Sequence, residues 1–205
     1  RIMLGYDPSE DDAYEVARYS IERRSMDSVV VSPIVLKDLQ RSGLYKRPTI
    51  RRNGQLWDVI SDAPMSTEFA ISRFFIPHLV DSDDDQWVMF ADSDIVCLVD
   101  IAELFALADP SKAIMCVKHI PLVSSETKKI NKTQTVYPFK NWSSVVLWNV
   151  KHPSNKRLTL DVLNLWPGRA LHAFEWLERD EIGTLPDRFN WLVRVNPEPA
   201  DPAIA

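Results

Sequence analysis

Trp87–Ala91 is a run of five apolar residues that leads directly into Asp92-Ser93-Asp94. An apolar run of this length followed by polar residues is typical of a fully buried strand, such as the central strand of a parallel sheet. Ligands of such sheets gather at the carboxyl ends of the strands, so the pattern predicts two carboxylates at a ligand-binding edge. Residues two apart on an extended chain project to one side, so both carboxylates can reach one cation.

Apolar runs of strand length alternate with helical patterns along the rest of the chain. We expect strands at 2–6, 29–35, 87–91, 113–118 and 145–148. We expect a helix from Ser9 with Ala13, Val16, Ala17, Ser20 and Ile21 on one face, and further helical segments at 36–44, 66–79, 101–108, 158–166 and 171–177. Residues 45–65, with Pro48, Gly54 and Pro64, are expected to be mostly loop. This order predicts an α/β fold with a mixed, mostly parallel sheet flanked by helices, in one domain.

The composition narrows the class of protein. The 205 residues include 29 acidic and 24 basic side chains, for a formal charge of -5, and the basic residues are scattered, which argues against a nucleic-acid partner. No apolar stretch approaches the roughly 20 residues of a transmembrane helix, so we expect a cytoplasmic protein with no transmembrane segment. Cys97 and Cys116 each stand in an apolar run, which favours buried, reduced thiols.

Two carboxylates held close together in a partly dry cleft repel each other at a cost of several kcal/mol, unless a cation or a proton compensates. Mg²⁺ and Mn²⁺ favour carboxylate and phosphate oxygens and keep coordination positions open for a diphosphate. We therefore predict that Asp92 and Asp94 bind Mn²⁺ or Mg²⁺. The alternative is that the pair caps a turn or forms salt bridges with basic side chains.

Four segments, in order along the chain, resemble the glycosyltransferase A-type fold, most closely the family 8 nucleotide-sugar glycosyltransferases. They are the helix at 67–79 with Arg73, the strand and Asp-x-Asp pair at 87–96, the segment at 141–149 and Leu185-Pro186-Asp187-Arg188-Phe189-Asn190. The resemblance implies a metal-dependent enzyme that moves a sugar from a nucleotide donor, expected to be a UDP-sugar, to an acceptor that the sequence does not identify.

The resemblance also implies site residues. The donor would be bound by the end of the first strand, by Arg73 and by the acidic motif, that is by Gly5, Tyr6, Asp7, Arg73, Asp92, Ser93 and Asp94. Asn141, Trp142 and Ser143 would line the acceptor or sugar side. For Arg73 the competing interpretation is a structural pair with one of the two aspartates. His119 is a minor candidate, whereas His78, His152 and His172 are interpreted as peripheral or structural.

The chain also departs from the family pattern. Family members supply a third metal ligand from a late histidine, followed by a Lys-Pro-Trp stretch, but no histidine follows His172 here. We therefore expect the domain to lack a C-terminal segment, and the proline-rich residues 196–202 to lead back towards the metal edge. The family's Asp-Gln-Asp site would fall at 172–174, where no amide or carboxylate stands. No catalytic nucleophile or base can be assigned, and retention or inversion of configuration stays open.

Two other functions use the same residues. The strand followed by Asp92-x-Asp94-x-Val96 also resembles the first motif of haloacid dehalogenase-type phosphatases, in which the first aspartate is a nucleophile. That motif normally opens its domain, and here some 90 residues precede it. The third interpretation is a catalytically silent protein that binds a nucleotide sugar, because the family's late histidine and glutamine are missing. The oligomeric state stays open.

Overall fold

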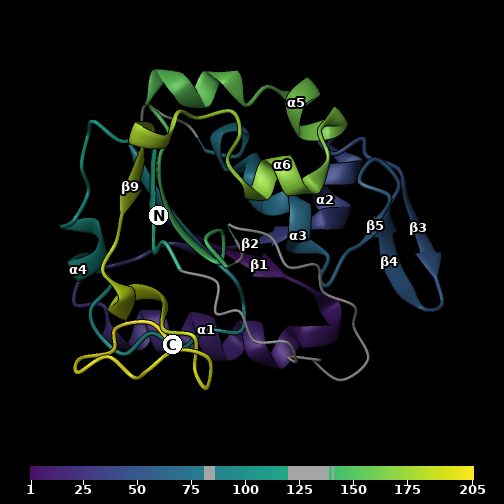
Figure 1. The fold of residues 1–205 in the computed structure, drawn as a ribbon. Coiled ribbons are helices and arrows are strands. Elements are labelled where there is room, and N and C mark those ends of the chain that lie inside the picture. The colour runs from purple at the N-terminus through teal and green to yellow at the C-terminus, as the bar shows by residue number, and fades with distance from the viewer. Residues whose placement is uncertain (81–85, 120–138, 140) are drawn as a thin grey trace.

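The computed structural model describes residues 1–80, 86–119, 139 and 141–205 (Figure 1). The strands are β1 (Ile2–Tyr6), β2 (Val31–Val35), β3 (Thr49–Arg52), β4 (Gln55–Asp58), β5 (Ala63–Pro64), β6 (Trp87–Ala91), β7 (Ile114–Cys116), β8 (Val145–Asn149) and β9 (Ile182–Thr184). The α-helices are α1 (Asp11–Arg24), α2 (Leu36–Arg41), α3 (Phe69–Ser72), α4 (Ala102–Phe105), α5 (Leu160–Leu165) and α6 (Gly168–His172). Short 3-10 helices are η1 (Pro8–Glu10), η2 (Arg73–His78), η3 (Pro153–Arg157), η4 (Arg179–Glu181) and η5 (Asp187–Asn190).

A six-stranded sheet with the order β2-β1-β6-β8-β7-β9 forms the centre of the molecule. β1 pairs in parallel with β2 and β6, and β7 pairs in parallel with β9, whereas β8 runs antiparallel to its neighbours β6 and β7. The expected α/β class with a mixed, mostly parallel sheet is therefore confirmed. Because β8 alone is reversed in this sheet, its first residues lie at the edge where β1 and β6 end.

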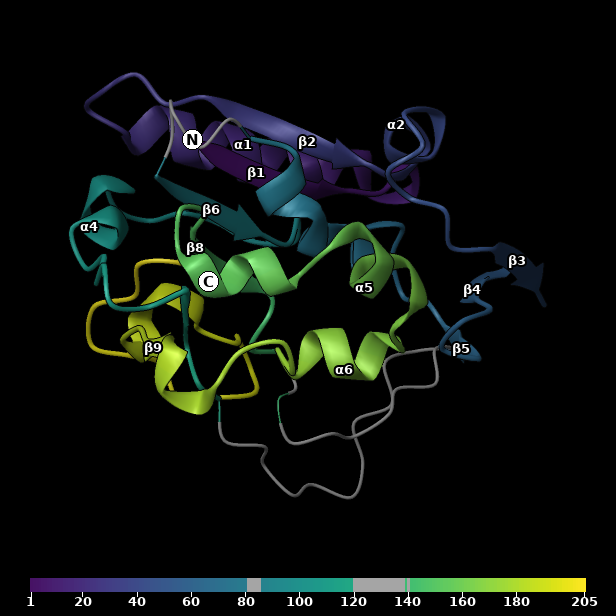
Figure 2. The same cartoon turned by 90° about the horizontal axis from the view of Figure 1, so that it is seen from above.

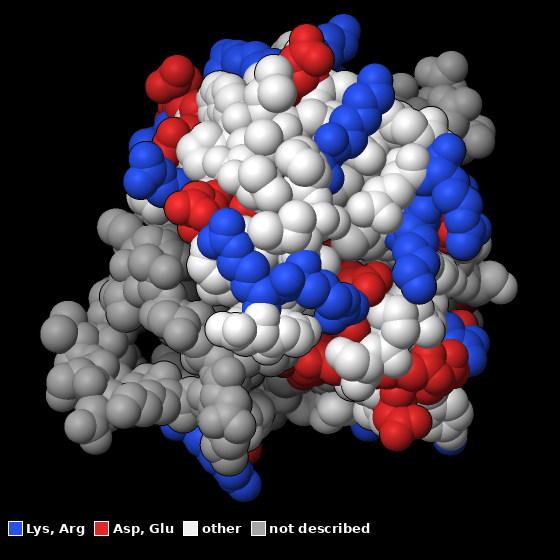
Figure 3. Space-filling model, turned by 90° about the vertical axis from the view of Figure 1, so that its right-hand side faces the viewer, with Lys and Arg blue, Asp and Glu red and all other residues white. Residues whose placement is uncertain are grey.

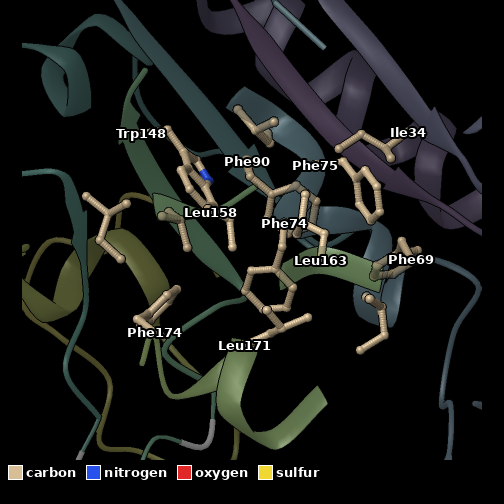
Figure 4. Packing of buried hydrophobic residues seen from close by; sticks show 14 of the residues in the cluster. Ile34, Phe69, Phe74, Phe75, Phe90, Trp148, Leu158, Leu163, Leu171 and Phe174 are labelled. Atoms are coloured by element: carbon tan, nitrogen blue, oxygen red, sulfur yellow. The ribbon is translucent and has the colours of Figure 1, made fainter. Parts of the chain in front are cut away.

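The sheet is covered on both faces. Helix α1 lies along one face, while α2, α3, α5 and α6 cover the other (Figures 1 and 2). Successive residues of a strand point to opposite faces, and in β6 Val88 and Phe90 join one hydrophobic cluster while Met89 and Ala91 join the other. The first cluster packs Phe74, Phe90 and Trp148 beneath α5 and α6 (Figure 4). This two-sided burial explains why β6 reads as a continuous apolar run.

The expectation that residues 45–65 are mostly loop is wrong in part, because a second sheet with the order β3-β4-β5 forms there. Thr49 pairs with Asp58 and Arg52 with Gln55 in an antiparallel hairpin. The two turn residues, Asn53 and Gly54, have φ angles of 52° and 79°. An Asn-Gly turn of this kind matches the twist of the strands that it joins, and it is a strong hairpin signal.

A buried ion pair ties this hairpin to the helices. Arg47 donates from Nε and Nη2 to the two carboxylate oxygens of Asp58, and its Nη1 donates to the carbonyls of Leu163 and Trp166 at 2.8 and 2.7 Å. Neither side chain of the pair is more than 2% exposed. Asp58 also accepts from the Ser61 hydroxyl, and Ser61 Oγ accepts from the amide of Gly168 at the start of α6. We call Arg47, Asp58 and Ser61 the hairpin latch.

The predicted helices are shorter in the structure than in the sequence pattern. The helix expected at 66–79 is α3 followed by the 3-10 helix η2, and Glu68 rather than Ser66 precedes it. The helix expected at 171–177 ends at His172, because Phe174 takes a φ of 53°. Val16, expected on the buried face of α1, is 54% exposed.

Both cysteines are free and buried, as the sequence predicts. Burial raises the pKa of the Cys116 thiol to about 12, so that the thiol stays protonated. Among the helices in the described part of the chain, none combines the length and the hydrophobicity needed to cross a membrane.

Candidate functional site

Asp92, Ser93 and Asp94 follow β6 at the edge where β1 ends and β8 begins. The amide of Asp92 donates to the carbonyl of Ser144 at 2.8 Å, which fixes the motif against the residues before β8. Ser93 is buried and Asp94 is exposed. The expected position of the acidic pair at the carboxyl end of a central strand is therefore observed.

Arg73 joins Asp92 to the residues before β8. Its Nη1 lies 2.7 Å from Asp92 Oδ1 and donates to the carbonyl of Ser143 at 2.8 Å. The guanidinium is only 8% exposed and lies 5.1 Å from the ring centroid of Phe90. The structural pair that we weighed for Arg73 is thus present.

The charge of the Asp92 carboxylate is poorly compensated by its surroundings. Burial raises the pKa of Asp92 to about 7, although Arg73 pulls the pKa down, and the charge of Asp94 raises it further. One guanidinium therefore does not offset both carboxylates. Within the described ranges, no group of three or more His, Cys, Asp or Glu side chains is placed to hold a metal. Two carboxylates are a fitting donor set for Mg²⁺ or Mn²⁺ where phosphate oxygens complete the shell.

The end of β1 carries the three other expected donor-binding residues. Gly5 packs so tightly against the ring of Phe69 that a Cβ on it would lie 2.4 Å from the ring carbons. The Tyr6 hydroxyl donates to Asp11 at 2.8 Å, and the ring packs edge-on against Tyr14. Asp7 is buried and accepts from the amides of Ser9 and Glu68, both at 2.9 Å.

A cavity of about 740 Å³ lies between Asp7 and the β3–β4 hairpin. Its walls carry acidic groups on Asp7 and Glu68 and basic groups on Lys37 and Arg51. The face that carries the hairpin shows the same mixture, with acidic side chains in a hollow beside basic ones (Figure 3). Within the part of the chain that the structure describes, Glu68 Oε2 is buried without a hydrogen-bond partner. This cavity was not foreseen, because the hairpin that walls it was expected to be loop.

Asn141, Trp142 and Ser143 precede β8 at the same edge. Asn141 takes a φ of 66°, and its carbonyl accepts from Asn190 at 3.2 Å and from the Ser144 hydroxyl at 2.7 Å. Trp142 Nε1 donates to the carbonyl of His119 at 2.9 Å. The Leu-Pro segment thus reaches this group through Asn190, a contact residue that was not among the expected site residues.

His119 lies at this edge, as expected from its place after β7, but it is not grouped with the aspartates. Its ring is buried, and burial lowers its pKa. The side-chain amide of Asn196 lies 3.1 Å from His119 Nδ1. The rest of the lid expected at 119–138 lies outside the described residues.

The last residues of the described chain return to the acidic motif. The amide of Val96 donates to the carbonyl of Ala205 at 2.7 Å, and the amide of Leu98 donates to Ala203 at 2.8 Å. Cys97 and Ile204 form an isolated antiparallel bridge. Ala205 therefore lies beside the residues that follow Asp94, which agrees with the expectation that residues 196–202 lead back towards the aspartates.

Comparison with known sequences places the chain in a family. Protein CDI of Arabidopsis thaliana is 47% identical over 192 residues, and the match covers 94% of this chain and 69% of that protein. The chain belongs to the protein CDI family. No protein-family model matches the chain.

Solved structures identify the fold of this CDI-family chain. The glycosyltransferase GlyE of Streptococcus pneumoniae TIGR4 superimposes with a TM-score of 0.54 at 15% identity, over 92% of this chain and 45% of GlyE. The galactosyltransferase LgtC, solved with donor and acceptor sugar analogues, matches with a TM-score of 0.54 at 16% identity, over 92% of this chain and 74% of LgtC. Mouse xyloside xylosyltransferase 1 matches with a TM-score of 0.52 at 12% identity, over 92% and 86% of the two chains.

These likenesses show that the chain has the glycosyltransferase A-type fold. The chain spans less than half the length of GlyE. Identities of 12–16% establish the shared fold alone.

Proposed function

We propose that this protein transfers a sugar from a nucleotide donor, of the UDP-sugar class, to an acceptor, and that a divalent cation assists. The observation that carries the proposal is the pair Asp92 and Asp94 at the carboxyl edge of β6, the edge of the sheet at which the parallel neighbour β1 also ends. Asp7, which follows β1, lines the cavity beside the hairpin. Three of the similar folds belong to glycosyltransferases, and one of these was solved with donor and acceptor sugar analogues. These two lines of support are independent of each other.

In this proposal Asp92 and Asp94 hold Mn²⁺ or Mg²⁺ together with the donor diphosphate. When bound, the cation supplies Lewis-acid stabilisation of the charge on the departing nucleoside diphosphate. Arg73 keeps the Asp92 carboxylate in place through its 2.7 Å ion pair. Tyr6 and Asp7 lie towards the nucleoside end of the donor, while Gly5 and Ser93, both buried, support that wall from behind.

The acceptor or donor sugar lies against Asn141, Trp142 and Ser143. Asn141 offers its amide to sugar hydroxyls, and the Trp142 ring offers an apolar face. Ser143 is buried with its hydroxyl on His172, so it shapes this side from behind. The Trp142 ring is fixed by its hydrogen bond to His119, so it can orient a sugar without moving. The protein's task is to orient two substrates and to exclude water between them.

The phosphatase alternative receives less support from these contacts. A phosphatase of that class requires the first aspartate to attack phosphorus as a nucleophile. Here Arg73 Nη1 lies 2.7 Å from Asp92 Oδ1, which reduces the nucleophilicity of that carboxylate. Asp92 also follows six strands and three α-helices of the described chain rather than opening the domain.

Calorimetric titration with UDP, with and without Mn²⁺, tests the proposal. We expect Mn²⁺ to tighten UDP binding to the wild type, because the diphosphate completes the cation's coordination shell. Asp94→Asn should remove at least about tenfold of that gain, since even indirect partners of metal ligands cost 10- to 100-fold. Asp161→Asn, on the exposed surface of α5, is the matched control and should bind as the wild type does. A UDP affinity that changes neither on addition of Mn²⁺ nor in Asp94→Asn would contradict the proposal.

A further inference from the structure

His172, the last residue of α6, bridges two segments that lead to the acidic motif. Its Nδ1 lies 2.8 Å from Ser143 Oγ, and the ring makes a hydrogen bond to the backbone of Ala70. The ring also packs edge-on against Phe74, with centroids 5.0 Å apart and planes at 84°. One side chain therefore contacts α3, η2 and the residues before β8.

The two hydrogen bonds fix the position of the ring proton. Burial, with a further contribution from Arg73, lowers the pKa of His172 to about 3, so the neutral ring carries one N–H. The Ala70 carbonyl can only accept, so the ring donates there, and Nδ1 accepts from the Ser143 hydroxyl. His172 thus holds the Ser143 side chain in one orientation.

The Ser143 carbonyl connects the fixed position of Ser143 to Asp92 through Arg73. Its carbonyl accepts from Arg73 Nη1 at 2.8 Å, and the same nitrogen lies 2.7 Å from Asp92 Oδ1. The neighbouring carbonyl of Ser144 accepts from the amide of Asp92 at 2.8 Å. The residues before β8 therefore hold Asp92 at both its backbone and, through Arg73, its carboxylate.

The other end of α6 is fixed as well. The amide of Gly168 donates to Ser61 Oγ at 2.8 Å, and Ser61 belongs to the hairpin latch. Leu171 of α6 packs with Phe74 in the same hydrophobic cluster (Figure 4). His172 is therefore presented to Ser143 by an element that is anchored at its start and packed along its length.

We propose that His172 is a positioning residue of the donor site: it holds Ser143, whose carbonyl orients Arg73 on Asp92, and it thereby keeps the Asp92 carboxylate ready for the cation and the diphosphate. This inference rests on the proposed function, because it takes Asp92 and Asp94 as the cation-binding pair. His172 acts through Ser143 and Arg73, and touches neither the donor nor the cation.

The test compares UDP affinity, with and without Mn²⁺, in His172→Phe, Ser143→Ala and the double variant. Phenylalanine keeps a ring against Phe74 but removes both hydrogen bonds of the histidine. Each single variant should bind UDP with Mn²⁺ about five- to tenfold more weakly, the loss expected of one positioning hydrogen bond. The double variant should be no weaker than the worse single variant, because both changes remove the same contact. UDP affinity without Mn²⁺ should change less than about twofold.

His152→Phe is the matched control, because His152 also accepts a hydrogen bond on Nδ1 but lies past the end of β8, at the opposite edge of the sheet. It should bind UDP as the wild type does. Losses that add in the double variant, or that are equal with and without Mn²⁺, would overturn the inference. If His172→Phe does not fold, the UDP affinity of Ser143→Ala with and without Mn²⁺ tests the inference by itself.

Asp94→Asn in the same titration separates the two proposals. If Asp94→Asn weakens Mn²⁺-dependent binding and the His172 and Ser143 variants do not, the positioning role fails and the proposed function stands. If Asp94→Asn has no effect, the proposed function fails and the role of His172 fails with it.

Discussion

Replacing Arg47 by methionine should strongly destabilise the fold, because it leaves the Asp58 carboxylate buried without its counter-charge. Both side chains of the pair are at most 2% exposed, and Arg47 also donates to the carbonyls of Leu163 and Trp166. Removing one partner of a buried pair costs about 3–5 kcal/mol, and we expect about 4 kcal/mol for Arg47→Met. For a chain of this size that corresponds to a melting temperature lower by about 8–16 °C.

Chemical denaturation at neutral pH measures this loss. Arg41→Met is the matched control, because Arg41 and Asp38 form a pair that is 76% and 63% exposed, and its loss should stay within about 0.5 kcal/mol. The double variant Arg47→Met/Asp58→Leu should be no less stable than Arg47→Met alone, since it removes the stranded charge. A loss below about 1 kcal/mol for Arg47→Met would show that the Asp58 carboxylate does not depend on Arg47 for its counter-charge.

The same pair predicts how the loss depends on pH. Burial alone raises the pKa of Asp58, but hydrogen bonds from Arg47 and Ser61 outweigh it and lower the pKa below its ordinary value of 3.8. The stability that the pair contributes is therefore present above about pH 4 and lost as the pH falls through the folded-state pKa. The destabilisation by Arg47→Met should begin to shrink already above pH 4 as the pH falls, because burial without Arg47 raises the pKa of Asp58 and the stranded carboxylate takes up a proton there.

Two further changes test the packing and the electrostatics of the site. Gly5→Ala places a Cβ 2.4 Å from the ring of Phe69, which is 2% exposed and cannot move freely. Denaturation should therefore show a free energy of unfolding lower by about 1–3 kcal/mol. A stability equal to that of the wild type would show that α3 shifts to accommodate the methyl group. Burial lowers the folded-state pKa of His172 from 6.5 to about 3, so the unfolded chain binds more protons than the folded chain between these two pH values. The free energy of unfolding of the wild type should therefore fall by up to about 1.4 kcal/mol per pH unit below pH 6.5, relative to His172→Gln. Parallel stability curves for the two proteins between pH 5 and 6.5 would contradict the assigned neutral ring.

The central strands of the main sheet, β1, β6, β7 and β8, could be predicted from the sequence because both of their faces are buried, whereas the edge strand β9 was not predicted. β1 and β6 have the expected bounds, and β8 extends one residue further than expected. The hairpin at β3 and β4 was missed although Asn53-Gly54 carries its signal, because Arg51, Arg52 and Gln55 do not alternate with apolar residues. Its register depends on the turn and on the Arg47–Asp58 contact, which joins residues that no local pattern connects.

The candidate site was predictable where one strand carries it and not where side chains meet across elements. The position of Asp92 and Asp94 follows from the apolar run before them. The pairing of Arg73 with Asp92 was weighed as an alternative, and the geometry decides it. His172 was interpreted as peripheral or structural. Its contact with Ser143 could not be foreseen, because it joins α6 to the residues before β8 across 29 positions of the sequence. Such contacts depend on how the layers pack, which periodicity does not specify.

Turnover of sugar nucleotides is the decisive test of the proposed transferase activity. The protein is incubated with several UDP-sugars and Mn²⁺, and separately with a phosphate monoester, while UDP release and phosphate release are followed. We expect UDP release from at least one UDP-sugar, dependent on Mn²⁺ and lost in Asp94→Asn but not in Asp161→Asn. Phosphate release from the monoester with no UDP release from any sugar nucleotide would contradict it and would favour the hydrolase.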